Sequence, residues 1–173
     1  MGASSDESIA NCARYGLGLL TSTLTPLKEI APKCQYYLEK CEETDAPYNA
    51  NPGHGTIGIG RMVYVADTDA QAKEEAEESV CKHVDSFTGA ASSGYLGKVS
   101  EASQEELQGA DYEKLREDTI IYGSPESVIE KIKYMEEITG ADSLILHFPP
   151  YNTREQNARV LAQFAEDVIP KFR

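Results

Sequence analysis

The chain has 173 residues, of which 29 are Asp or Glu and 16 are Lys or Arg, so its net charge is −13, and 40% of its residues are hydrophobic. These values are typical of a folded globular domain. They exclude a disordered chain and a collagen-like repeat, and no apolar run approaches the roughly 20 residues of a membrane span. The negative charge disfavours nucleic acid and membrane surfaces as partners. No segment has the layout of a signal peptide, so the sequence predicts a cytoplasmic protein.

The four cysteines are predicted to be buried, reduced thiols. None of them belongs to a C-x-x-C pair, and no histidine lies at ligand spacing, so the sequence predicts neither a metal site nor a redox motif. Cys34 and Cys41 fall on one predicted helix, about 10 Å apart along its axis, which is too far for a disulfide.

Three elements are predicted before residue 45. An apolar stripe behind a serine pair predicts a short helix over Asp6–Tyr15, which Gly16 closes. The apolar run Leu17–Ser22 is typical of a parallel strand that is buried on both faces. A longer amphipathic helix is then predicted over Thr25–Glu43.

The middle of the chain is less regular. Alternating side chains predict a strand over Ile59–Ala66, and a capping box of Thr68 with Gln71 begins an acidic helix that extends to about Phe87. Residues 88–119 combine a Gly- and Ser-rich stretch with a polar, helix-like segment. An excursion of this length is typical of a lid, a binding loop or a disordered segment.

The last part of the chain is again regular. A helix is predicted over Ser124–Gly140, a strand over Leu144–Phe148 and a terminal helix over Arg154–Ile169. The alternation of helices and strands predicts an α/β fold with a parallel sheet and right-handed crossovers. Three strands and a short predecessor at Met1–Ala3 are few for such a sheet, so residues 1–173 are expected to form one domain that is part of something larger. The residues expected to face inward on the terminal helix are Ala158, Leu161, Ala165 and Val168.

Four segments, in order, resemble the bacterial-luciferase-like flavin monooxygenases. They are MGASSDESIANCARYGLGLLTST, RMVYVADTDAQAKEEAEE, YGSPESVIEKIKYMEEITGADSLILHF and FAEDVIPKFR. Enzymes of this family are (β/α)₈ barrels of about 250 residues or more, so the resemblance implies a partial TIM barrel that comprises the end of strand 5 and units 6 to 8. The family's catalytic base and most of its flavin-ring and substrate pocket lie in the first half of the barrel. No residue of this chain is therefore assigned a catalytic role.

The turn that begins the first helix is the main candidate site. A strand end meets a helix N-terminus there, where free N–H groups and the positive end of the helix dipole attract anions. In the resembling enzymes this turn holds the flavin phosphate, which assigns Ala3, Ser4, Ser5 and Ser8 to cofactor binding. The same residues also fit an ordinary helix cap, in which Ser5 caps the helix and Ser8 completes the arrangement.

Phosphate binding at this turn sets two conditions. Asp6 and Glu7 have to point to solvent, because a carboxylate would repel the phosphate. A basic group has to come from elsewhere, and the missing half is its expected source. Thr21 and Ser22, at the end of the next strand, either line the flavin side of the pocket or serve as ordinary turn residues.

The other candidates also have a plainer alternative. His147, followed by Phe148, closes the last strand at the same rim, where it either orients a polar group or is a hydrogen-bonded structural residue. Tyr95 touches substrate if the excursion is a lid. His54 and His83 are expected to be surface residues.

The resemblance implies a monooxygenase that takes reduced FMN from a separate flavin reductase and uses O₂ to oxygenate a small organic substrate. One alternative is a deazaflavin-dependent oxidoreductase on the same fold, which transfers hydride and uses no O₂. Another is a non-catalytic flavin-binding or assembly half-barrel. Because a partial barrel has unpaired strand edges, we expect the chain to form a homo-oligomer or to pair with the missing half.

Overall fold

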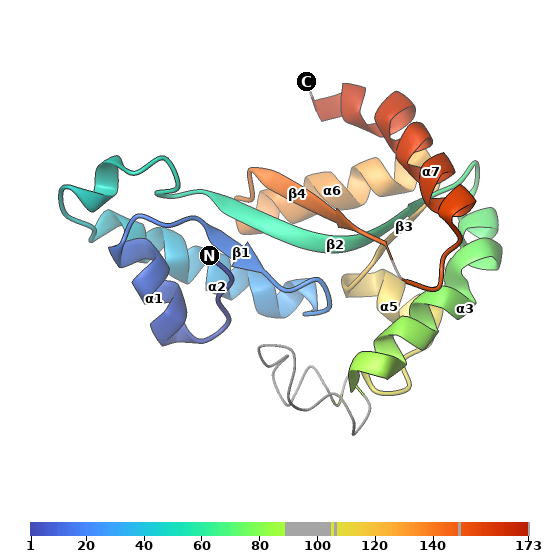
Figure 1. Ribbon diagram of the computed structural model, residues 1–173, viewed down its shortest axis with the longest axis horizontal. Coiled ribbons are helices and arrows are strands. Elements are labelled where there is room, and N and C mark those ends of the chain that lie inside the picture. Colours follow the sequence, from blue (N-terminus) through green and yellow to red (C-terminus); the bar gives the residue numbers. More distant parts are fainter. Residues whose placement is uncertain (89–104, 106, 149, 173) are drawn as a thin grey trace.

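In the computed structural model, which describes residues 1–88, 105, 107–148 and 150–172, parallel strands are covered by helices (Figure 1). Among the described residues, no helix has the length and apolar character needed to cross a membrane. The elements in chain order are α1 (Asp6–Arg14), β1 (Leu19–Thr21), α2 (Leu27–Glu42), a 3₁₀ turn (Tyr48–Ala50), β2 (Ile57–Val65), α3 (Asp69–Thr88), α5 (Tyr112–Asp118), β3 (Ile121–Gly123), α6 (Pro125–Thr139), β4 (Ser143–His147), α7 (Arg154–Gln163), a π turn (Phe164–Val168) and a 3₁₀ turn (Ile169–Phe172).

β2 is the central strand of the sheet. Its first part pairs with β1 and β4, and its last three residues pair with β3, always in parallel. Beyond β1, the N–H of Ala3 donates to the carbonyl of Leu20 (3.2 Å), and the N–H of Leu20 donates to the carbonyl of Met1 (2.9 Å). Met1–Ala3 therefore pairs with β1 through an isolated parallel bridge, at the place where the sequence predicts a short strand.

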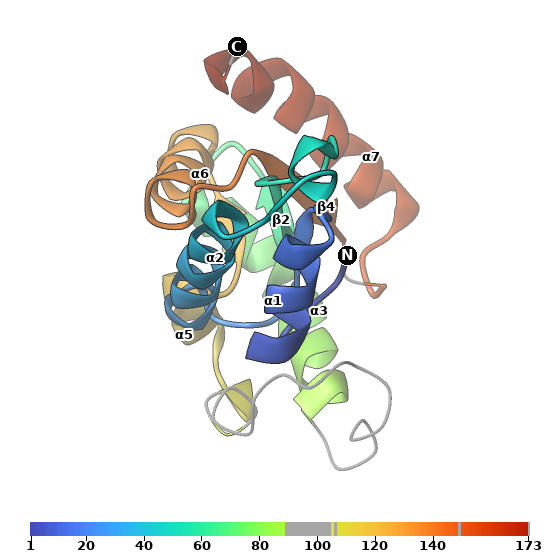
Figure 2. The same cartoon turned by 90° about the vertical axis from the view of Figure 1, so that its left-hand side faces the viewer.

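One face of the sheet packs against helices. Its side chains meet those of α1, α2 and α6 in one apolar core, and Figure 2 shows α2 and α6 along the same side of β2. The strands and this helix layer are what the parallel α/β pattern predicts. The buried sheet residues in this core are Leu19, Ile57, Ile59, Val63, Val65 and Ile121.

The other face of the sheet is open where β1, β2 and β4 lie side by side. Leu20 is 38% exposed and Ile145 is 46% exposed. A Cβ atom built on Gly58, between them, would lie 3.4 Å from Cδ1 of Leu20 and 3.7 Å from Cδ1 of Ile145. These three residues therefore form one surface, which we call the open sheet face.

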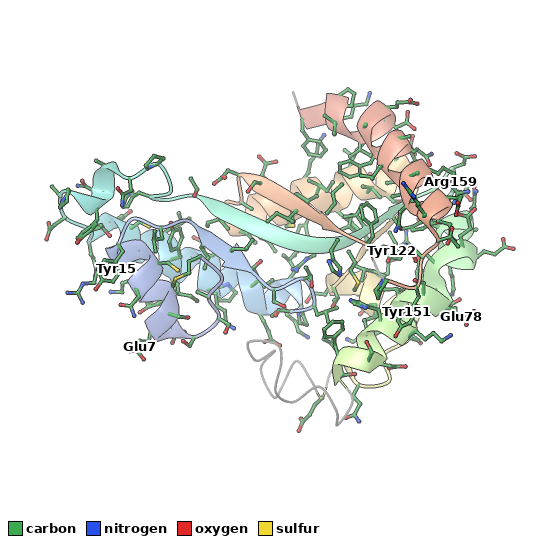
Figure 3. The ribbon with its side chains drawn as sticks, viewed as in Figure 1. Glu7, Tyr15, Glu78, Tyr122, Tyr151 and Arg159 are labelled. Atoms are coloured by element: carbon green, nitrogen blue, oxygen red, sulfur yellow. The ribbon has the colours of Figure 1, made fainter. Side chains whose placement is uncertain are left out.

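A second core covers the last part of β2. There α3 and α5 pack on Met62, Tyr64 and Ala66. The hydroxyl of Tyr64 donates to Glu75 of α3 (2.7 Å). Glu75 also forms an ion pair with Arg159 of α7, and Figure 3 shows Arg159 close to α3. This network fixes α3 and α7 at the carboxyl end of the central strand.

The structure shifts the bounds of predicted strands and adds one strand that was not predicted. β1 and β2 are confirmed, although β1 is shorter than predicted and β2 begins two residues earlier. β3 was not predicted, because three residues are too few to display an alternating pattern.

The capping box at Thr68 is only half formed: Thr68 accepts from the N–H of Gln71 (3.1 Å), whereas the side chain of Gln71 donates to Glu75. All four cysteines are free, with three buried and Cys81 half-buried.

The predicted inward face of the terminal helix is wrong except at Val168. The buried residues are Val160, Phe164 and Val168, whereas Ala158, Leu161 and Ala165 are exposed. Both sets have a helical period, so the sequence does not distinguish them. The π turn over Phe164–Val168, in which hydrogen bonds run from i to i+5, keeps residues four apart on one side.

Two buried tyrosines provide a test of the core. The Tyr37 hydroxyl donates to the carbonyl of Leu17 (2.9 Å) and accepts from the N–H of Gly55 (3.0 Å). The Tyr122 hydroxyl is buried with no partner among the described residues. We expect Tyr37→Phe to lower the free energy of unfolding by about 1–3 kcal/mol, because it removes hydrogen bonds to two partly buried backbone groups, and Tyr122→Phe to leave it unchanged or raise it. Urea denaturation measures both, and equal losses would contradict this account.

Candidate functional site

The serine turn is a complete helix cap. The Ser5 hydroxyl accepts from the N–H of Ser8 (3.3 Å). The Ser8 hydroxyl accepts from the N–H groups of Ser5 (3.1 Å) and Ser4 (3.2 Å) and donates to the carbonyl of Ser5 (2.8 Å). The sequence fits this geometry, since a serine at the cap and another three residues later form a capping box.

The first turn of α1 still has free donors. The N–H groups of Asp6 and Glu7 precede the first intrahelical hydrogen bond, so they point out of the helix end. Both acidic side chains are exposed, and Figure 3 shows Glu7 at the outer end of α1. The carboxylates thus meet the first condition for an anion at this turn, namely that they point to solvent.

A hollow of about 400 Å³ lies beside this turn, a size within the usual range of ligand sites. It is formed by the Met1–Ala3 segment and the end of β1, which run parallel to each other. Thr21 is one of the lining residues, and its hydroxyl oxygen is buried with no partner among the described residues. The lining residues are Gly2, Ala3, Ser4, Leu20, Thr21, Ser22 and Thr23.

The structure brings some of the predicted cofactor residues together. Ala3 and Ser4 line the hollow together with Thr21 and Ser22, whereas Ser5 and Ser8 lie in the cap behind it. None of the lining residues is basic, so these residues provide no cation for a phosphate. The expected basic partner is therefore not among them.

The histidines lie away from the hollow. His147 is half-buried at the end of β4, with its ring 5.5 Å from that of His83. The prediction that His83 is a surface residue is wrong, since it is 3% exposed, and its ring packs 4.5 Å from that of Phe87. His54 is half-buried too, with Nε2 3.1 Å from the carbonyl oxygen of Cys41. Tyr95 lies outside the described residues.

Burial has a clear electrostatic effect on the His83 imidazole. Loss of solvent, with a smaller contribution from His147, lowers the pKa of His83 to about 4. Its Nδ1 atom is buried without a partner among the described residues. A signal for this burial was present in the sequence, because His83 lies at helical spacing from Ala76 and Val80 on the apolar side of α3.

Arg61 is the polar residue near the hollow that the sequence analysis missed. It is 2% exposed in the middle of β2, and its Nη1 donates to the carbonyls of Ser22 (3.2 Å) and Gly60 (3.1 Å). The sequence contained a signal for this burial, because Arg61 is a charged residue within a predicted strand that is otherwise apolar. Among the described residues, no group of three or more His, Cys, Asp or Glu is placed to hold a metal ion.

Comparison with known proteins gives the chain its family. The sequence matches the luciferase-like monooxygenase family over residues 1–143. No match is found among curated proteins.

Solved structures share the fold. One is the oxygenating constituent of 3,6-diketocamphane monooxygenase from Pseudomonas putida in complex with FMN (21% identity, TM-score 0.70, covering 98% of this chain and 47% of that one). Another is the monooxygenase RslO1 from Streptomyces bottropensis (15%, 0.67, 99% and 47%). A third is the coenzyme F420-dependent tetrahydromethanopterin reductase from Methanopyrus kandleri (17%, 0.62, 100% and 50%).

The chain therefore spans about half the length of these solved structures. Its parallel α/β sheet agrees with the partial TIM barrel that the sequence predicts. With the match over residues 1–143, the chain belongs to the luciferase-like monooxygenase family.

Proposed function

We propose that the chain is the carboxyl-terminal part of a flavin-dependent monooxygenase, and that its hollow and the Ala3–Ser8 turn hold the phosphate end of FMN. The observation that carries this proposal is the position of the 400 Å³ hollow, which lies at the end of two parallel strands and beside a helix N-terminus. Ligands of parallel barrels gather at this end of the strands.

The residues present fit a phosphate in part. Ser4 and the free N–H groups of α1 offer donors, the small Ala3 permits close approach, and the acidic side chains of the first turn point to solvent. Ser5 and Ser8 have hydroxyls engaged in the cap and contribute by shaping the turn. The cation that completes the site is proposed to come from the other half of the barrel.

Reduced FMN, when bound, would supply the electrons that activate O₂, and O₂ would supply the oxygen atom that is transferred to a small organic substrate. The residues of this chain bind and orient it. A flavin reductase is the proposed source of the reduced cofactor. The alternative of a deazaflavin coenzyme and hydride transfer is favoured by the similarity to the F420-dependent reductase. A half-barrel that binds flavin or assembles without turnover is the remaining alternative.

Titration of the chain with FMN, followed by fluorescence, tests the proposal. We expect saturable binding that weakens about tenfold or more for riboflavin and for Ser5→Ala/Ser8→Ala, because hydrogen bonds to a charged phosphate are lost or misplaced. The matched control is Thr153→Ala/Gln156→Ala, which removes the equivalent capping box of α7, away from the hollow.

Three outcomes discriminate the candidates. Binding of a deazaflavin coenzyme in place of FMN would favour the hydride-transfer alternative. Absence of binding by the folded chain, followed by binding once the amino-terminal half of the barrel is added, would assign the missing cation to that half. Absence of binding in both experiments would leave the serine turn as a helix cap and contradict the proposed site.

A further inference from the structure

Arg61 is an unusual residue to find inside this sheet. It is a fully buried cation in a strand otherwise composed of glycine and hydrophobic residues. Burial lowers its pKa to about 10, and Asp118 is the first of the charges that oppose this effect. Because a buried charge is costly unless it is paired and hydrogen-bonded, its partners are informative.

The partners of Arg61 hold the loop that lines the hollow. Its Nη1 donates to the carbonyl of Ser22, the residue at which the chain leaves β1. The neighbouring Gly60 brings β2 close to the same loop, since a Cβ there would lie 2.7 Å from Cγ2 of Thr23. Ser22 and Thr23 both line the hollow, so Arg61 and Gly60 support it from behind.

A small cavity lies beside Arg61. Nη2 is buried and has no partner among the described residues. Arg61 and Asp118 line one small cavity of about 30 Å³, enough for one water molecule. Asp118 also accepts from the N–H of Lys28 (3.1 Å), at the start of α2, so it braces the far end of the same loop.

We propose that Arg61 is a positioning residue for the hollow: its guanidinium clamps the loop over residues 22–26 between Ser22 and, through one water in the cavity, Asp118. The role of the clamp in cofactor binding rests on the proposed function. The clamp itself is a property of the ligand-free chain. An arginine is needed because its planar fork reaches two partners on different sides, which the single ammonium of a lysine does not.

The test compares three variants by hydrogen exchange of the ligand-free chain and by FMN titration. Arg61→Met keeps the side-chain length and removes the charge, and it leaves the carbonyls of Ser22 and Gly60 without their donor. Asp118→Asn removes the opposing charge and keeps an acceptor for the N–H of Lys28. Lys131→Met is the control, since Lys131 lines the same cavity but donates to the carbonyls of Arg116 and Ile120, away from the loop.

We expect the amides of residues 22–24 to exchange about tenfold faster in Arg61→Met and a few-fold faster in Asp118→Asn, with β2 and α2 unchanged and no local effect in Lys131→Met. If Arg61→Met does not fold, faster exchange of residues 22–24 in Asp118→Asn supports the clamp, and unchanged exchange there contradicts it. Unchanged exchange at residues 22–24, or acceleration spread evenly over the chain, would overturn the clamp.

The FMN titration distinguishes the Arg61 clamp from the proposed function. Weaker FMN binding by a folded Arg61→Met chain, at a melting temperature close to that of the wild type, supports positioning, because a merely structural role would change both together. Local acceleration of exchange in a chain that binds FMN neither alone nor with the amino-terminal half of the barrel would keep the clamp and contradict the proposed function alone.

Discussion

The stability of the chain is expected to fall as the pH drops from about 6.5 to 4, and His83 is expected to be a main cause. Its pKa in the folded chain is about 4, below the ordinary value of 6.5, because the imidazole is buried and faces His147. Between pH 6.5 and 4, the His83 imidazole therefore stays neutral in the folded chain and is protonated in the unfolded chain. The stabilisation is complete above pH 6.5 and is lost as the pH falls toward 4, a change of about 3 kcal/mol for this one group.

The variant that isolates this effect is His83→Leu. It removes both the titration and the unpartnered Nδ1 atom, so we expect its free energy of unfolding to vary much less between pH 6.5 and 4. Urea denaturation of the wild type and of His83→Leu at a series of pH values gives the two curves. Parallel curves for the wild type and His83→Leu would show that His83 is not held neutral by its burial.

Much of this fold follows from local patterns in the sequence. The helix over Pro125–Thr139 has its predicted cap at Ser124, whose hydroxyl accepts from the N–H of Ser127, and its predicted end at Gly140, where φ is 67°. These signals involve residues only a few positions apart. The location of the hollow follows from topology, because the carboxyl ends of neighbouring parallel strands meet at one edge of a sheet.

The features that escaped prediction depend on contacts between distant residues. The buried state of Arg61 is decided by a strand, the loop at Ser22 and Asp118, which are far apart in the chain. The orientation of α7 depends on which of two similar stripes meets the core. β3 is set by pairing with Val63–Val65 and not by its own three residues. Periodicity within a segment carries no information on such contacts.

The open sheet face is expected to make the chain associate with itself. Leu20 and Ile145 flank Gly58 there, so their exposed side chains form one apolar patch that another molecule can contact. Among the described residues, β4 pairs only with β2, so its other edge has free backbone groups. An exposed apolar face beside an unpaired edge favours pairing with another chain.

Sedimentation or light scattering over a range of concentrations should therefore detect a dimer or larger species. Leu20→Glu and Ile145→Glu should each weaken association about 100-fold, equivalent to about 2.7 kcal/mol, because a carboxylate would be desolvated in the interface. Tyr134→Glu is the control, since Tyr134 is 57% exposed on α6, in the helix layer and away from the open sheet face. The amino-terminal half of a luciferase-like barrel should compete with self-association, because it would cover the same surface. A wild-type chain that stays monomeric at every concentration would contradict this account and would mean that the open sheet face is tolerated in water.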